Sequence, residues 1–123
     1  MNGLFAFLLM IFLHIVDDYT LQGWLASAKQ EKYWNENAPQ KLYKYDYIWA
    51  LIMHSFSWSF MIMLPIAYVR SFEVDMWFAI ALAANLIIHA VVDDLKANKK
   101  VINLWIDQLI HILQIEVTAF IFL

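Results

Sequence analysis

Residues 3–22 have the sequence GLFAFLLMIFLHIVDDYTLQ, and this stretch decides the fold. Its first part, up to Leu13, is entirely apolar, and polar side chains appear only from His14 onward. An apolar helix of roughly 20 residues is long enough to cross the hydrocarbon core of a bilayer. The stretch lacks the basic start and the small-residue cleavage site of a secretory signal, so we expect it to be retained as a transmembrane helix.

The rest of the chain has the same character. It is 63% hydrophobic and only 15% charged over 123 residues, which is far too apolar for a soluble domain of this size. Two glycines and two prolines are too few for the turns of a β-barrel, so the composition predicts an all-α protein. We expect a single domain, residues 1–123, that forms an integral membrane bundle of four transmembrane helices at 3–22, 47–69, 76–93 and 101–123, with a longer polar loop at 23–46.

The basic residues predict the orientation of these spans. Lysines are confined to two loops: Lys29, Lys32, Lys41, Lys44, Lys96, Lys99 and Lys100. The positive-inside tendency then predicts that loops 23–46 and 94–100 are cytoplasmic and both termini are outside, in a bacterial inner membrane. Because no long basic tract is present, we expect no nucleic-acid partner; membrane lipid is the expected partner, and a homo-oligomer is left open.

Histidine and aspartate recur at one spacing within the apolar spans. Three spans carry such a pair four residues apart: His14 with Asp18, His89 with Asp93, and Asp107 with His111. Positions i and i+4 of a helix differ by only about 40° around the axis, so both side chains of each pair project in the same direction. The remaining span contributes His54. This spacing predicts inward-facing polar stripes that suit a metal clamp.

The depth of these residues supports a shared site. His14 precedes Gln22 by eight residues, and His54 follows Tyr47 by seven, which places both histidines roughly 10 to 12 Å below the same surface. The polar residues of the other two spans lie at similar depth. Ionisable groups in hydrocarbon cost several kcal/mol unless they are partnered, so we expect this cluster to have a function.

The donor chemistry favours a metal site but leaves two alternatives. No cysteine is present, so imidazole and carboxylate must supply all ligands, and a divalent ion such as zinc, with manganese or iron as further candidates, fits them. The expected ligands are His14, Asp18, His54, His89, Asp93, Asp107 and His111, enough for one ion with supporting groups or for two ions. A proton or ion pathway and a purely structural hydrogen-bonded bundle are the alternatives.

Three other acids are expected to lie apart from the ligands. Asp17 and Asp94 each neighbour a ligand in the sequence but point about 100° away from it, so we expect rim or supporting positions for both. Glu116 lies deep in the fourth span and is expected to pair with Arg70 across the outer leaflet.

These motifs resemble the family of small bacterial and phage membrane proteins known as domain of unknown function 3307. The resemblance covers nearly the whole chain and rests on His14, Asp18, Gln22, Trp24, Lys29, His54, His89, Asp93, Lys96, Asp107, Gln108 and His111. It implies the fold and the candidate site but no assigned activity.

The function that we expect is that of a membrane-embedded, metal-dependent hydrolase acting on a lipid-linked or membrane-proximal substrate. A carboxylate not fully used in coordination, Asp18 or Asp93, would be the general base. Gln22, Lys96 and Gln108 are the expected substrate-binding residues. The alternative is a non-catalytic membrane component, such as a metal or proton transport subunit or a phage or host accessory protein.

Overall fold

The computed structural model describes residues 1–123 and contains helices but no strand, which confirms the all-α prediction. Its elements are α1 (Gly3–Val16), a π-helical turn η1 (Asp17–Leu21), α2 (Leu25–Ala28), α3 (Glu31–Asn37), a 3-10 turn η2 (Lys41–Tyr43), α4 (Asp46–Val69), α5 (Met76–Ala97) and α6 (Leu104–Phe122). The expected polar loop therefore contains two short helices.

Three of the four long helices begin at a capping side chain. The Asn2 side chain accepts a hydrogen bond from the backbone N–H of Phe5, and Asp75 caps α5 in the same way. Asn103 accepts from the backbone N–H of Ile106. Such a cap satisfies an N–H group that has no partner within the helix. It also explains why α6 begins three residues later than the sequence pattern predicts.

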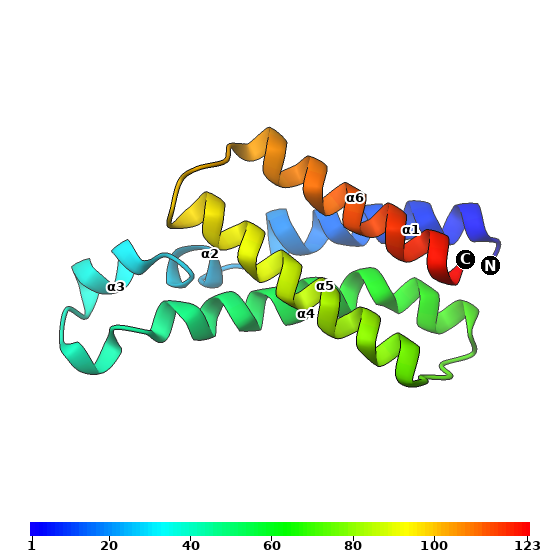
Figure 1. The fold of residues 1–123 in the computed structure, drawn as a ribbon, viewed down its shortest axis with the longest axis horizontal. Helices are drawn as coiled ribbons and strands as arrows, with labels where there is room; N and C mark the ends of the chain where they lie inside the picture. The colour runs from blue at the N-terminus through cyan, green and yellow to red at the C-terminus, as the bar shows by residue number, and fades with distance from the viewer.

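The long helices form a bundle with two distinct ends (Figure 1). Both termini and the α4–α5 connection, residues 70–75, lie at one end, which we call the terminal end. The opposite end, which we call the loop end, holds residues 22–45 and 98–103. There the side chain of Asn98 donates to the backbone carbonyl of Lys29 at 2.9 Å and accepts from the backbone N–H of Glu31 at 2.7 Å. The two lysine-rich loops therefore share one end, as predicted.

The distribution of polar and apolar side chains is compatible with an integral membrane protein. Four helical segments are long and apolar enough to cross a bilayer: Gly3–Leu21, Lys41–Val69, Met76–Ala97 and Leu104–Phe122. Large apolar side chains face outward, among them Phe120 at 90% and Trp105 at 79% exposure, whereas many buried residues are polar or charged. A soluble protein of this size buries such apolar side chains and exposes its charges.

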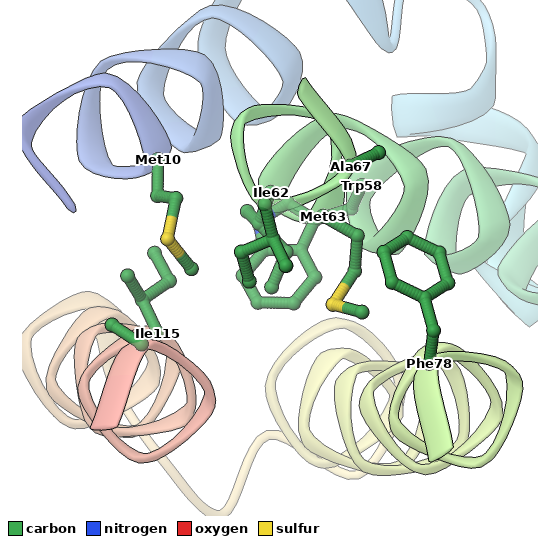
Figure 2. Packing of buried hydrophobic residues seen from close by; sticks show 9 residues of the cluster. Met10, Trp58, Ile62, Met63, Ala67, Phe78 and Ile115 are labelled. Atoms are coloured by element: carbon green, nitrogen blue, oxygen red, sulfur yellow. The ribbon is translucent and has the colours of Figure 1, made fainter. Parts of the chain in front are cut away.

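An apolar core fills the terminal half of the bundle. Figure 2 shows Met10 of α1, Ile115 of α6 and Phe78 of α5 directed toward the α4 residues Ile62 and Met63. All but Phe78 are at most 1% exposed. Helix α4 packs against each of the other three long helices. This close-packed half holds α1, α4, α5 and α6 in the register that brings their polar residues together nearer the loop end.

Arg70 does not pair with Glu116, so that prediction is wrong. The guanidinium of Arg70 lies 2.6 Å from the carboxylate of Asp75, within the short α4–α5 connection, and Glu116 is exposed on α6. Two residues five positions apart in a tight connection meet at a smaller entropic cost than residues on separate helices. The hydrogen bond from Arg70, together with one from the backbone N–H of Phe78, lowers the pKa of Asp75 below its ordinary value of 3.8.

Candidate metal centre

The three predicted pairs face inward and lie in one buried cluster. The nearest nitrogen and oxygen atoms are 3.6 Å apart in the His14–Asp18 pair, 3.7 Å apart in the His89–Asp93 pair and 3.3 Å apart in the Asp107–His111 pair. His54 joins them from α4 and is fully buried. The prediction that each pair projects from one helical face is confirmed, and all four long helices contribute to the cluster.

Four of the expected ligands form a compact group, which we call the donor tetrad: Asp18, His54, His89 and Asp93. The Nε2 atom of His54 lies 3.2 Å from His89 Nε2, 3.2 Å from Asp18 Oδ1 and 3.3 Å from Asp93 Oδ2. The Nε2 atom of His89 lies 3.8 Å from Asp18 Oδ1 and 3.7 Å from Asp93 Oδ2. Donors bound tetrahedrally at zinc distances are about 3.3 Å apart. These five donor–donor distances are therefore close to the spacing that one such ion requires.

Of the two positions expected for Asp17, rim or supporting, the structure places it inside the cluster beside His54. Its side chain is fully buried, accepts a 2.6 Å hydrogen bond from the Ser57 hydroxyl, and brings Oδ2 to 3.7 Å from His54 Nδ1. The cause is the π-helical turn, in which the backbone N–H of Gln22 bonds to the carbonyl of Asp17 five residues earlier. This wider turn departs from the regular helical step, so Asp17 and Asp18 both reach the cluster. Asp17 holds the supporting position behind a histidine that is typical of metal sites.

His14 lies beside the donor tetrad, and both of its ring nitrogens are hydrogen-bonded. The indole N–H of Trp58 donates to His14 Nδ1 at 2.8 Å, and His14 Nε2 lies 3.0 Å from the Gln108 side-chain oxygen. Because indole is only a donor and an amide oxygen is only an acceptor, His14 is the neutral tautomer with its proton on Nε2. It has no free lone pair for a metal, so we assign it a supporting position.

Gln108 connects His14 to two carboxylates. Its side-chain amide donates to Asp107 Oδ2 at 2.9 Å and to Asp18 Oδ2 at 3.3 Å, while its oxygen faces His14. Both ends of the Gln108 amide are therefore engaged within the cluster. This arrangement orients Asp18 and Asp107, which goes beyond the substrate-binding position that the sequence predicts for Gln108.

Sequence reasoning from spacing did not identify Lys29 as part of the site. The residue is only 7% exposed, and its ammonium donates to Asp93 Oδ2 at 2.7 Å and to the Gln22 side-chain oxygen at 2.9 Å. Gly23 has a φ of 51°, which lets the chain turn back over the end of the bundle after α1. Helix α2 then packs on α4 and directs Lys29 inward. Only the family resemblance pointed to this lysine.

The charges around the cluster are unbalanced. Four carboxylates, those of Asp17, Asp18, Asp93 and Asp107, lie near only two ammonium groups. Lys29 contacts Asp93 at 2.7 Å, and Lys96 lies 3.5 Å from Asp107. With neutral histidines, this leaves an excess of two negative charges in a setting where unpaired charge is costly. One divalent cation would neutralise the excess.

Several buried polar atoms of the cluster make no hydrogen bond. They are Asp17 Oδ2, His54 Nδ1, His89 Nδ1, Asp107 Oδ1 and His111 Nε2. Buried polar atoms in folded proteins are nearly always partnered, and a bound ion is one recognised explanation for such exceptions. Asp17 Oδ2 and His54 Nδ1 face each other at 3.7 Å, and the remaining groups, with the donor spacing and the excess charge, are those of a cluster that could hold a metal ion.

The cluster is reached from the loop end. A cavity of about 520 Å³ there is lined by Gln22, Lys29, Asp93, Lys96 and Lys100, among others. A smaller recess extends from the same region to Asp18 and Gln108. Gln22 and Lys96 therefore line the entrance, as the sequence predicts. The apolar core lies on the side of the cluster that faces the terminal end.

No protein-family model, curated protein or solved structure matches the chain. The resemblance to domain of unknown function 3307 therefore stays a prediction based on the motifs. The description of the site rests on the residues and distances given above.

Proposed function

We propose that the protein is a metal-dependent hydrolase embedded in a bacterial inner membrane, acting on a lipid-linked or membrane-proximal substrate. One observation carries the proposal: five donor–donor distances in the tetrad are close to tetrahedral spacing, and Asp93 lines the cavity at the loop end while Asp18 lines the smaller recess beside it. Hydrolytic metal sites combine a few protein ligands with access for water and substrate. Zinc is the first candidate, with manganese and iron as the others.

A divalent ion at this site would lower the pKa of a bound water and so supply a nucleophile near neutral pH. Such a water needs an open position on the ion, so His54, His89 and Asp93 would hold the ion and Asp18 would take up the water proton. The Asp18 side chain is 9% exposed against 3% for Asp93, and it contacts no ammonium group. The carboxylate of Asp93 is instead held by Lys29.

The cavity supports an anionic substrate. Lys96 and Lys100 line it together with Lys29, so a phosphate-bearing group entering from the surface meets a concentration of positive charge. Trp24, Tyr33 and Trp34 pack edge to face in the same loop end, and such aromatic residues favour the headgroup region of a bilayer. The substrate that we propose is a phosphate ester or phosphodiester of a lipid, reached from the cytoplasmic side.

Metal analysis of detergent-purified protein tests the first step. We expect zinc, manganese or iron in stoichiometric amount in the wild type and a loss of that metal in His89→Gln. Glu116→Gln is the matched control, because Glu116 is exposed on α6 outside the cluster. Metal-free protein that retains its activity would overturn the proposal.

Turnover tests the second step. The protein, reconstituted in phospholipid vesicles, should release phosphate or a headgroup from at least one member of a panel of phosphate monoester, diphosphate and phosphodiester lipids. His89→Gln and Asp18→Asn should abolish that release, whereas Glu116→Gln should retain it.

A metal or proton transport subunit is the alternative, and one feature favours it. Polar residues continue beyond His111 toward the terminal end as Gln114, Asn85 and Thr118, all buried. The apolar core around Ile62 and Ile115 closes this route before the terminal end. Metal flux into sealed vesicles without turnover of any lipid would favour transport over hydrolysis.

A further inference from the structure

The two carboxylate oxygens of Asp93 face different groups. Its Oδ2 atom belongs to the donor tetrad, 3.3 Å from His54 Nε2. Its Oδ1 atom points to the other side, 3.8 Å from His111 Nε2. Asp93 is therefore placed to bridge two neighbouring positions, as carboxylates do in two-metal sites.

The second position has two further donors that lack partners. Asp107 Oδ1 and His111 Nε2 lie 3.3 Å apart, yet neither atom makes a hydrogen bond. Both residues are fully buried. The other oxygen of Asp107 accepts from Gln108 at 2.9 Å and lies 3.5 Å from the Lys96 ammonium, so the carboxylate is held with Oδ1 directed at His111. These three donors have the spacing of ligands on one ion.

The tautomer of His111 follows from a chain of hydrogen bonds on α5 and α6. The Thr118 hydroxyl donates to the Gln114 carbonyl at 2.7 Å, so its oxygen accepts from the Asn85 amide at 2.9 Å. The Asn85 side-chain oxygen therefore accepts from the Gln114 amide at 3.2 Å. The Gln114 side-chain oxygen then faces His111 Nδ1 at 3.1 Å and can only accept. His111 thus carries a proton on Nδ1.

A neutral His111 with its proton on Nδ1 directs the Nε2 lone pair toward Asp93 and Asp107. An outer hydrogen bond that sets the tautomer of a histidine in this way is characteristic of metal ligands. His89 stacks on His111 with ring centroids 4.1 Å apart, and two protonated imidazoles at that distance would repel each other. At most one of these two rings therefore carries a positive charge.

We propose that Asp93, Asp107 and His111 form a second divalent-cation position, bridged through Asp93 to the ion in the donor tetrad. This inference rests on the proposed function and deepens it, since it makes the hydrolase a two-metal enzyme. Paired ions about 3.5 to 4 Å apart stabilise both the attacking and the leaving oxygen of a phosphoryl substrate. With Lys29 and Lys96 counted, two divalent ions exceed the charge of the four carboxylates by two, which an anionic phosphoryl substrate would offset.

Manganese binding tests the second position. The metal-stripped full chain in detergent is loaded with Mn²⁺, freed of excess ion and analysed for manganese per chain. We expect two ions in the wild type and in the control Glu116→Gln, and one ion in Asp107→Asn and in His111→Gln. One ion in the wild type, or two in Asp107→Asn, would overturn the second position.

Electron paramagnetic resonance supplies a test that does not depend on those variants being folded. Two Mn²⁺ ions bridged by Asp93 should give the spectrum of a spin-coupled pair in the wild type, and isolated-ion spectra only would overturn the bridge. Gln114→Leu removes the acceptor that holds His111 without removing a ligand. This substitution should lower the affinity for the second ion by about 10- to 100-fold and leave the affinity for the first ion unchanged.

The two proposals fail in distinguishable ways. A coupled manganese pair without turnover of any lipid phosphate would overturn the hydrolase and support the second position. Turnover by protein that holds a single ion would overturn the second position and leave the hydrolase standing. Protein that binds no manganese at all would overturn both.

Discussion

The two halves of the bundle are built on opposite principles. The terminal half is filled by apolar side chains such as Ile62, Met63 and Ile115. The loop half buries histidines and aspartates, several of which lack hydrogen bonds. Association of helices in lipid depends on close packing because lipid tails are as apolar as the side chains. The terminal half therefore stabilises the bundle, and the loop half contains the His and Asp groups that could hold a metal ion.

Trp58 lies where the two halves meet. It is a fully buried member of the apolar core. Its indole N–H donates to His14, and its ring stacks on His89 with centroids 4.2 Å apart. Trp58 thus connects the apolar core of the terminal half to His14 and to His89 of the tetrad. Substitutions in each half show whether the stability of the bundle and the affinity for metal depend on separate residues.

The largest expected effect comes from removing the metal. An ion that binds only the folded state at about 1,000 times its dissociation constant stabilises that state by about 4 kcal/mol. Thermal unfolding in detergent, followed by circular dichroism with and without a chelator, should therefore show a marked drop in Tm on metal removal. The drop should be absent in His54→Gln, which loses a tetrad ligand. An equal drop in His54→Gln would contradict the metal site.

Ile62→Ala should have the next largest effect, on stability alone. The side chain is fully buried in the apolar core, so its truncation leaves a cavity that costs about 3 kcal/mol. Metal affinity should stay at the wild-type value because Ile62 takes no part in the polar contacts of the tetrad. Ile80→Ala is the control, since Ile80 is 50% exposed on α5. A large loss of metal affinity in Ile62→Ala would show that the halves are not separable.

Asp17→Asn should lower the affinity of the site for metal without destabilising the terminal half. Its carboxylate faces His54 Nδ1, and loss of such an outer partner lowers metal affinity by about 10- to 100-fold. Asp94→Asn is a matched control, because Asp94 follows a ligand in the same way but bonds to Asn98 instead. Metal titration of both variants by calorimetry measures the difference. Equal affinities would contradict a supporting position for Asp17 and leave the rim position, the other one that the sequence predicts.

The fold and most of the site could be predicted from local patterns. The apolar runs predict four long helices, and the i, i+4 spacing of His89 with Asp93 predicts a shared face because both depend on regular helical geometry. The ends of α5 and α6 were less predictable. Helix α5 continues four residues past Asp93, and the cap at Asn103 delays α6.

The remaining features depend on irregular or long-range structure. Asp17 enters the cluster only because a π-helical turn changes the helical step, and no residue pattern at Asp17–Leu21 announces that turn. Lys29 reaches Asp93 across 64 positions of sequence through a turn at Gly23. The tautomers of His14 and His111 follow from side chains on other helices or from a whole network, which spacing alone does not specify.

The smallest expected effect lies at the terminal end, in the Arg70–Asp75 ion pair. Both side chains are partly exposed, at 25% and 48%, so solvent screens their attraction. Asp75→Asn removes the charge but keeps an oxygen that can cap α5 at the backbone N–H of Phe78, so it isolates the ion pair from the cap. We expect a slightly lower Tm at neutral pH and unchanged metal content.

The pH dependence of that small difference follows from the pKa of Asp75. Its hydrogen bond from Arg70 lowers the pKa in the folded state below the ordinary value of 3.8, so the pair stabilises the folded state fully at higher pH. The difference in Tm between wild type and Asp75→Asn should therefore be constant from about pH 8 to pH 5 and should shrink only as the pH falls below 3.8. Asp75→Ala, which also loses the cap, should stay less stable than Asp75→Asn throughout that range. A difference that grows on acidification would mean that a carboxylate other than Asp75 governs this end of the bundle.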